Sequence, residues 1–167
     1  MSEGPHPIDR MVLESAAVAE AADRLLAGHA AGEVRVGRAA WAVVLAAITR
    51  RAGHPLLVVP ARDEEARDLS ADLAALLGDN RVALWPSRGA VAGGTVGISP
   101  HITGQRARAV GMLGAPGQVV VASVPALAER VPAASARRGA VMVEVGQRQD
   151  LDAFVDRLAA MGYERVP

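Results

Sequence analysis

Lysine and cysteine are absent from this chain of 167 residues, whose 18 basic side chains, all arginine, balance 18 acidic ones. Without lysine, the chain cannot supply the amine that reaches the phosphates in a nucleotide-binding P-loop, or the amine that forms a Schiff base. Without cysteine, it can form no disulfide, thiolate nucleophile, iron–sulfur cluster or CxxC zinc site. We therefore expect no cofactor. We attribute the exclusive use of arginine to genome composition.

Aromatic residues and long apolar stretches are also scarce. The chain has two Trp, one Tyr and one Phe, although 51% of its residues are hydrophobic. The core must therefore consist of Ala, Val and Leu. The longest apolar run, 39–48, is about half of what a bilayer span needs. The first ten residues lack the layout of a secretion signal. A net charge of zero gives no field that attracts nucleic acid. We expect a cytoplasmic chain with no membrane partner.

Alternating helix and strand patterns predict the order of the elements. Helices are expected at 7–28, 39–52, 63–77, 99–113 and 125–130, and strands at 33–36, 55–60, 81–85 and 118–122. The run 55–60 is apolar throughout, which is typical of a strand buried on both faces. This alternation predicts an α/β fold with a parallel sheet flanked by helices.

The remaining segments suggest a second domain. The stretch 86–99 is rich in glycine and has no periodicity, so we expect a long loop there. A linker over 131–139 precedes a strand at 140–145 and a helix capped by Asp150. A further strand begins near Tyr163. We place a first domain at 1–132 and an incomplete second, α+β domain at 133–167.

The segment where a nucleotide-binding fold carries its phosphate loop is degenerate here. Between the expected strand 33–36 and the helix that follows, Gly37 and Arg38 remain, with no lysine and no Ser or Thr for magnesium. Any nucleotide chemistry would be lost, although the helix start could still bind an anion. Asp63, Glu64 and Glu65 resemble the acidic pair of a motor ATPase, but helix capping explains them more simply.

Other candidate motifs are weak. The glycines of 89–97 do not have GxGxxG spacing. The four histidines are scattered, which disfavours a metal site. Ser99 and His101 lack the GxSxG elbow of a hydrolase. The arginine pairs at 50–51, 106–108 and 137–138 favour solvated surface over a nucleic-acid site.

Taken in order, several segments resemble the amino-terminal region of the transcription-repair coupling factor family (Mfd), which is itself similar to the damage-recognition protein UvrB. The resemblance covers roughly 35–167, and the ordered series carries it. Its pieces are 38–51, GHPLLVV (53–59), EEARDLSADL (64–73), VALWP (82–86), Ser99–Pro100, VVVASVPAL (119–127), RVP (130–132), VGQRQDLD (145–152) and MGYERV (161–166).

This resemblance implies a UvrB-type, helicase-like α/β domain with a degenerate phosphate loop, followed by the beginning of a domain that binds the repair protein UvrA. It implies a non-catalytic module that recruits UvrA and packs against other domains of its parent. The modules that bind RNA polymerase and translocate DNA would lie outside the chain. Tyr163 and Arg165 are the candidate partner contacts, although Tyr163 could instead simply cover the preceding helix.

Two alternative functions remain open. The family usually reads close to WETLPYExLSP after the strand that ends at Trp85, and this chain departs from it over 86–99. The chain could instead bind a small anion or nucleotide through the glycine-rich loop 89–97, at the carboxyl ends of the strands. It could also be a purely structural remnant. The residues leave open whether the chain is a fragment or a stand-alone paralogue.

Overall fold

The computed structural model describes residues 11–12, 14–28, 33, 35–89, 99–129, 141, 143–161 and 163. The chain divides into two compact units, Met1–Arg130 and Val131–Pro167.

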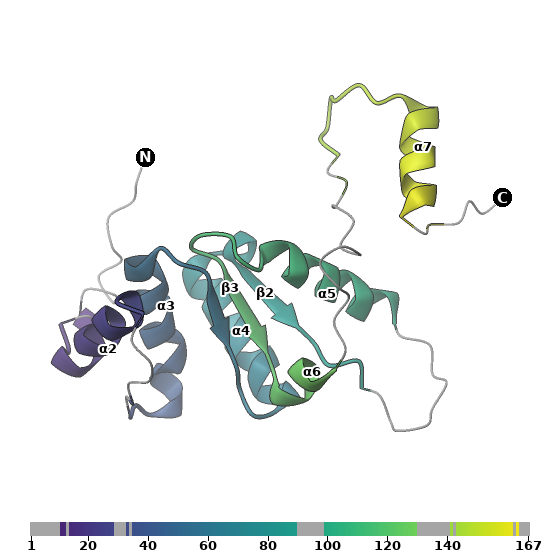
Figure 1. Cartoon of the computed structure of the whole chain (residues 1–167). Coiled ribbons are helices and arrows are strands. Elements are labelled where there is room, and N and C mark those ends of the chain that lie inside the picture. The colour runs from purple at the N-terminus through teal and green to yellow at the C-terminus, as the bar shows by residue number, and fades with distance from the viewer. Residues whose placement is uncertain are drawn as a thin grey trace. The chain divides into compact units, whose positions relative to one another are not determined.

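The first unit is built on a small parallel sheet (Figure 1). Its strands are β1 (Leu56–Val58), β2 (Val82–Trp85) and β3 (Val119–Ala122), in the order β1-β3-β2. β3 pairs in parallel with both neighbours, with Val120 opposite Leu57 and Ala83. The α/β architecture with a parallel sheet is therefore as the sequence predicts, and β1 and β2 are its two edges.

Helices α3 (Trp41–Ala52) and α4 (Asp63–Leu77) cover one face of the sheet. Leu73 of α4 and Val119 and Val121 of β3 are fully buried there. Both helices end where the sequence predicts, because Gly53 and Gly78 take positive φ angles of 62° and 94° that other residues rarely adopt.

Helices α5 (Pro100–Met112) and α6 (Val124–Ala128) cover the opposite face. The buried apolar residues of this layer are Ala83, Trp85, Ala109, Val120, Ala122 and Ala126. α5 begins as predicted, with Ser99 at the N-cap position and Pro100 in the first turn. The alternating side chains of β2 and β3 thus contribute to both layers.

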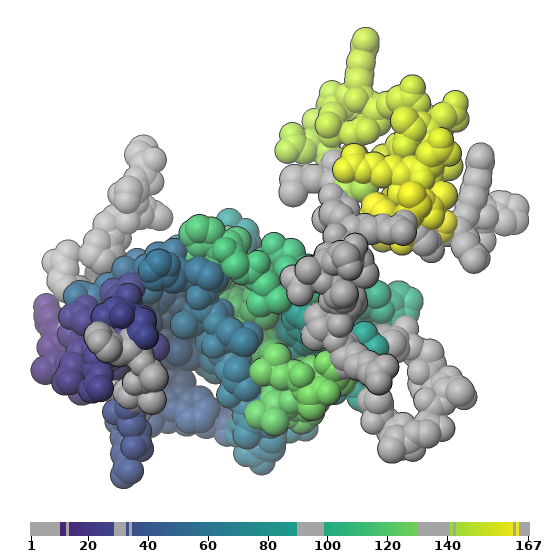
Figure 2. Space-filling view, viewed as in Figure 1, coloured from purple at the N-terminus to yellow at the C-terminus, as the bar shows by residue number. Residues whose placement is uncertain are grey.

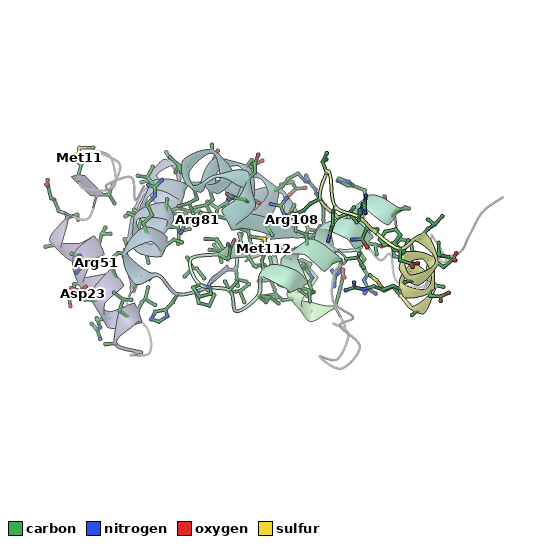
Figure 3. The ribbon with its side chains drawn as sticks, turned by 90° about the horizontal axis from the view of Figure 1, so that it is seen from above. Met11, Asp23, Arg51, Arg81, Arg108 and Met112 are labelled. Carbon is green, nitrogen blue, oxygen red and sulfur yellow. The ribbon has the colours of Figure 1, made fainter. Side chains whose placement is uncertain are left out.

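The first helix is shorter than its periodicity predicts. α2 spans Ala16–Leu26 and packs on α3 through Val18 and Ala22. Arg51 of α3 donates to Asp23 of α2 at 2.6 Å (Figure 3). Residues 11–12 are helical, but the chain turns at 14–15, so one continuous helix is wrong for the described residues; 1–10 lie outside them.

The strand predicted at 33–36 is also wrong among the described residues 33, 35 and 36. Glu33 and Arg35 are exposed and pair with each other at 2.8 Å. Two of the four residues of this segment are charged and pair locally, so it offers little apolar surface to bury. A short 3₁₀ helix, η1 (Arg38–Ala40), follows; a second, η2 (Asp79–Arg81), precedes β2.

The expected burial of the 55–60 strand on both faces is wrong. Leu56 and Val58 pack on the layer formed by α3 and α4, whereas Leu57 and Val59 are 48% and 46% exposed. β1 is an edge strand, and α5 contacts β2 and β3 instead. An apolar run therefore identified a strand but not its place in the sheet.

The second unit contains one described helix, α7 (Leu151–Ala160). Asp150 caps it as predicted, since its carboxylate accepts a hydrogen bond from the Ala153 amide at 3.0 Å. The strand expected at 140–145 is not formed by the described residues 141 and 143–145, because Val143 and Val145 are exposed and nothing described pairs with them. The linker 131–139 and the strand expected after Tyr163 lie outside the described residues.

Candidate functional site

The segment that the sequence predicts to be a degenerate phosphate loop lies at the start of α3. Gly37 caps η1, and its carbonyl accepts a hydrogen bond from the Ala40 amide at 2.9 Å. The Trp41 indole donates to the carbonyl of Val36 at 3.3 Å, which holds the turn against the helix. Gly37 has an ordinary φ of −61°, and a Cβ placed on it would meet no atom within 4 Å. This turn therefore requires a glycine neither for its backbone angle nor for space.

The charge of Arg38 is directed at the first turn of α4. Its guanidinium lies 3.6 Å from the Glu65 carboxylate, which also accepts a hydrogen bond from Arg62 at 2.8 Å. That hydrogen bond lowers the pKa of Glu65 and raises the pKa of Arg62. A phosphate at this turn would have to compete with a carboxylate that two arginines already share.

The predicted capping role of the α4 carboxylates needs correction. Arg62 occupies the N-cap position and makes no side-chain capping bond. Asp63 instead accepts a hydrogen bond from the Ser123 hydroxyl, which links the start of α4 to the start of α6. The three carboxylates of the first turn still lie at the positive end of the helix dipole.

A cavity of about 280 Å³ opens at the carboxyl end of β2. Parallel sheets place ligands at this end of their strands. Asp63 and Arg67 of α4, Trp85 of β2, and His101 and Gln105 of α5 line the cavity. The lining therefore includes acidic, basic and uncharged side chains.

A buried ion pair, which sequence reasoning missed, lies close to this cavity. Glu129, just after α6, accepts hydrogen bonds from Arg106 at 2.8 Å, the Ser87 hydroxyl at 2.9 Å and the Arg88 amide at 2.7 Å. Arg106 also donates to the Pro86 carbonyl at 2.7 Å, and its guanidinium carbon lies 4.9 Å from the centre of the Trp85 ring. We call these residues the Glu129 cluster; it fixes the segment after β2 to the end of α6.

The prediction that the 106–108 arginine pair is solvated surface is wrong for Arg106, which is 6% exposed. Burial lowers the pKa of its guanidinium, and the charge of Glu129 opposes that effect. Arg108 is exposed, but it too donates to backbone carbonyls, those of Asp79 and Val82. No local signal could have revealed the pair, since Glu129 follows Arg106 by 23 residues.

The structure describes only part of the other candidate ligand sites. Of the loop 89–97, only Gly89 is described, and its amide donates to the Ser87 hydroxyl at 3.1 Å. Within the described ranges, no group of three His, Asp or Glu side chains could hold a metal ion. His6 and His29 lie outside these ranges, as does the pair 137–138.

The predicted partner contact, Tyr163, lies on an open surface of the second unit. Its side chain is 64% exposed, so it covers little of α7, and its amide donates to the Leu158 carbonyl at 3.1 Å. Val143, Val145 and Leu151 are also exposed. The described residues of this unit are drawn in yellow-green and yellow in Figure 2. No described residue of this unit is buried. Arg165 lies outside the described residues.

Comparison with known proteins finds a similarity to a transcription-repair-coupling factor. The chain is 26% identical over 145 residues to the transcription-repair-coupling factor of Bacillus subtilis (strain 168), an alignment that covers 86% of this chain and 12% of that protein. No family model and no solved structure matches the chain. None of the described helices has the length and apolar character needed to cross a bilayer. The chain is thus similar, over most of its length, to a small part of a transcription-repair-coupling factor.

Proposed function

We propose that this chain is a non-catalytic module of a transcription-coupled DNA repair factor and that it helps to recruit UvrA, with a UvrB-type first domain at 1–132 and part of a UvrA-binding domain at 133–167. The observation that carries the proposal is the similarity to the Bacillus subtilis factor over 145 residues. Other domains of the parent protein are the second class of partner. RNA polymerase and DNA would be reached only through modules outside the chain.

The absence of catalysis is argued from the degenerate phosphate loop. The chain has no lysine to neutralise a triphosphate. Arg38, the cation at the loop, already faces Glu65 at 3.6 Å. The strand that would precede such a loop is not formed by the described residues 33, 35 and 36. These features favour a scaffold that binds other macromolecules over one that hydrolyses nucleotides.

Partner binding is argued from the second unit. Val145, Leu151 and Tyr163 expose their apolar side chains, and exposed apolar surface marks protein interaction sites when it is contiguous. Tyr is enriched at such interfaces because its ring is apolar and its hydroxyl can remain hydrated. Tyr163 and Arg165 are accordingly the side chains we assign to UvrA contact.

Titration with UvrA from the same organism tests the proposal. The 167-residue chain is expected to bind in calorimetry, and Tyr163→Ala should weaken binding by at least about tenfold if the ring is an interface anchor. Leu25→Ser, at a 53%-exposed position on α2 of the first unit, is the matched control and should bind like the parent chain. An absence of binding would contradict UvrA recruitment.

A thermal melt with magnesium-ATP tests the non-catalytic part separately. Binding to the folded state raises the melting temperature, so a flat melting temperature is expected up to millimolar nucleotide. The comparisons do not favour the alternative, a small-anion or nucleotide site at loop 89–97. A rise in melting temperature that saturates with ATP would overturn the proposal and support that alternative.

A further inference from the structure

The outer edge of β2 carries a groove that the proposed function does not use. β2 pairs with β3 on one side, and in the described sheet no strand covers its other side (Figure 1). Two cavities of about 280 and 250 Å³ lie between α4 and α5 along this edge. Both are lined by Arg67, Leu84 and Gln105, so they are neighbours. We call them together the β2 groove.

The backbone direction of β2 follows from one hydrogen bond. Arg108 of α5 (Figure 3) donates to the Val82 carbonyl at 3.3 Å, so this carbonyl points away from β3. The backbone groups of alternate residues in a strand point to the same side. The amide and carbonyl of Leu84 therefore also face the groove, at the place where its two cavities meet.

Arginines of α5 already cover the two ends of this edge. Arg108 engages Val82 at one end, and at the other end Arg106 donates to the Pro86 carbonyl at 2.7 Å. Pro86 has no amide N–H to offer. Edge strands are usually protected against pairing in such ways. Half-buried Leu84, between the two ends, is left with both a donor and an acceptor directed outward.

The charged side chain that both cavities share is Arg67, whereas Asp63 lines one cavity and Asp79 the other, so a negatively charged ligand is favoured at the shared part. Arg67 and His101 are exposed and Gln105 is half-buried, and within the described part of the chain none of the three has a hydrogen-bond or ion-pair partner. The nearby carboxylate of Asp63 already accepts a hydrogen bond from Ser123. Arg67 is thus a guanidinium ready to pair with a carboxylate at the shared part of the groove.

We propose that the β2 groove binds an extended peptide segment of another protein, which pairs its backbone with Leu84 and places an acidic side chain against Arg67. Adding a strand to a sheet edge provides affinity through main-chain hydrogen bonds and specificity through neighbouring side chains. Gln105 can donate to or accept from the same segment, because its amide has both kinds of group. This site belongs to the first unit and is independent of Tyr163 and of UvrA binding.

Amide chemical shifts of the ¹⁵N-labelled 167-residue chain test this proposal. The probe is a pool of acetylated and amidated pentapeptides with glutamate at the centre and valine or threonine elsewhere, at millimolar concentration. The signals of Leu84 and Gln105 should shift and saturate. A matched pool with an N-methylated central residue cannot donate the main-chain hydrogen bond and should leave both signals in place.

Two variants separate the ion pair from general binding. Arg67→Gln should weaken binding of the glutamate pool by roughly threefold, which is the size of effect expected for an exposed ion pair. Arg24→Gln, at an exposed position on α2 whose guanidinium lies 3.7 Å from Glu20, should bind like the parent chain. Unchanged spectra, equal shifts with the N-methylated pool, or shifts at Leu57 of β1 instead of Leu84 would each overturn the proposal.

Discussion

The two units of this chain are both poor in aromatic residues, but they differ in what they bury. In the first unit, two helical layers enclose a parallel sheet, and Leu73, Val119 and Val121 are completely inaccessible. In the second unit, α7 carries Leu151, Phe154 and Leu158, yet no described residue is buried. Small side chains can thus form a core where a sheet provides a surface to cover. A single amphipathic helix has no such surface.

Truncating one leucine in each unit should give the largest difference in the free energy of unfolding. Leu73→Ala in α4 is expected to lower the free energy of unfolding by about 3 kcal/mol, because it removes a fully buried side chain and leaves a cavity. Leu158→Ala in α7 should cost less than about 1 kcal/mol, since that side chain is only half-buried.

Urea denaturation followed by tryptophan fluorescence provides the measurement, because Trp41 and Trp85 both lie in the first unit. The Leu158→Ala transition should overlay that of the parent chain. Equal losses of unfolding free energy for the two variants would show that α7 contributes to the core of the first unit. That result would contradict the difference in burial between the two units.

Removing the carboxylate that pairs with a buried arginine should have the next largest effect. Glu129→Gln keeps the shape of the side chain but leaves Arg106, whose side chain is 7% exposed, without its carboxylate. A buried cation that loses its partner is destabilising, but Glu129 is itself only partly buried, so we expect a loss of about 2 kcal/mol in the same urea experiment. The matched change in the second unit, Glu144→Gln at an exposed position, should stay within about 0.5 kcal/mol.

A second change distinguishes charge from packing in the Glu129 cluster. Arg106→Met, added to Glu129→Gln, removes the unpaired cation but keeps an unbranched side chain over the Trp85 ring. The double variant should recover part of the lost stability. If it were less stable than Glu129→Gln alone, the hydrogen bond from Arg106 to Pro86 would matter more than the ion pair.

Sequence patterns predicted the elements whose signals are local. Gly53 and Gly78 ended their helices as expected, and Ser99–Pro100 and Asp150 marked helix starts. The parallel sheet also followed from alternating strand and helix patterns. In each case the responsible residues lie within a few positions of the feature that they determine.

The features that were missed depend on distant residues. The apolar run around Leu57 could not show that β1 would be an edge strand, because this depends on where α5 packs. In the sequence, nothing distinguishes Arg106 from the exposed residues near it, because only the fold brings its partner Glu129 next to it. The segment at Gly37 forms a turn before a helix, and the contact of Arg38 with Glu65 depends on where α4 packs. The predicted contact role of Tyr163 stays a prediction.

The smallest expected effects come from the two helix caps, which are chemically alike and differ in their surroundings. Ser123 is fully buried; its hydroxyl accepts a hydrogen bond from the Ala126 amide at 3.1 Å and donates one to Asp63. Ser123→Ala leaves both groups without this partner, so we expect the first unit to lose about 1 to 2 kcal/mol in urea denaturation.

Asp150→Ala removes the cap of α7, whose ten residues are few for a helix that lacks a core behind it. That variant should leave the tryptophan transition unchanged but lower the helix population of α7, seen as carbon chemical shifts of 151–160 moving toward random-coil values. Retained helical shifts would mean that packing, and not the cap, holds α7, which contradicts the contrast between the two units.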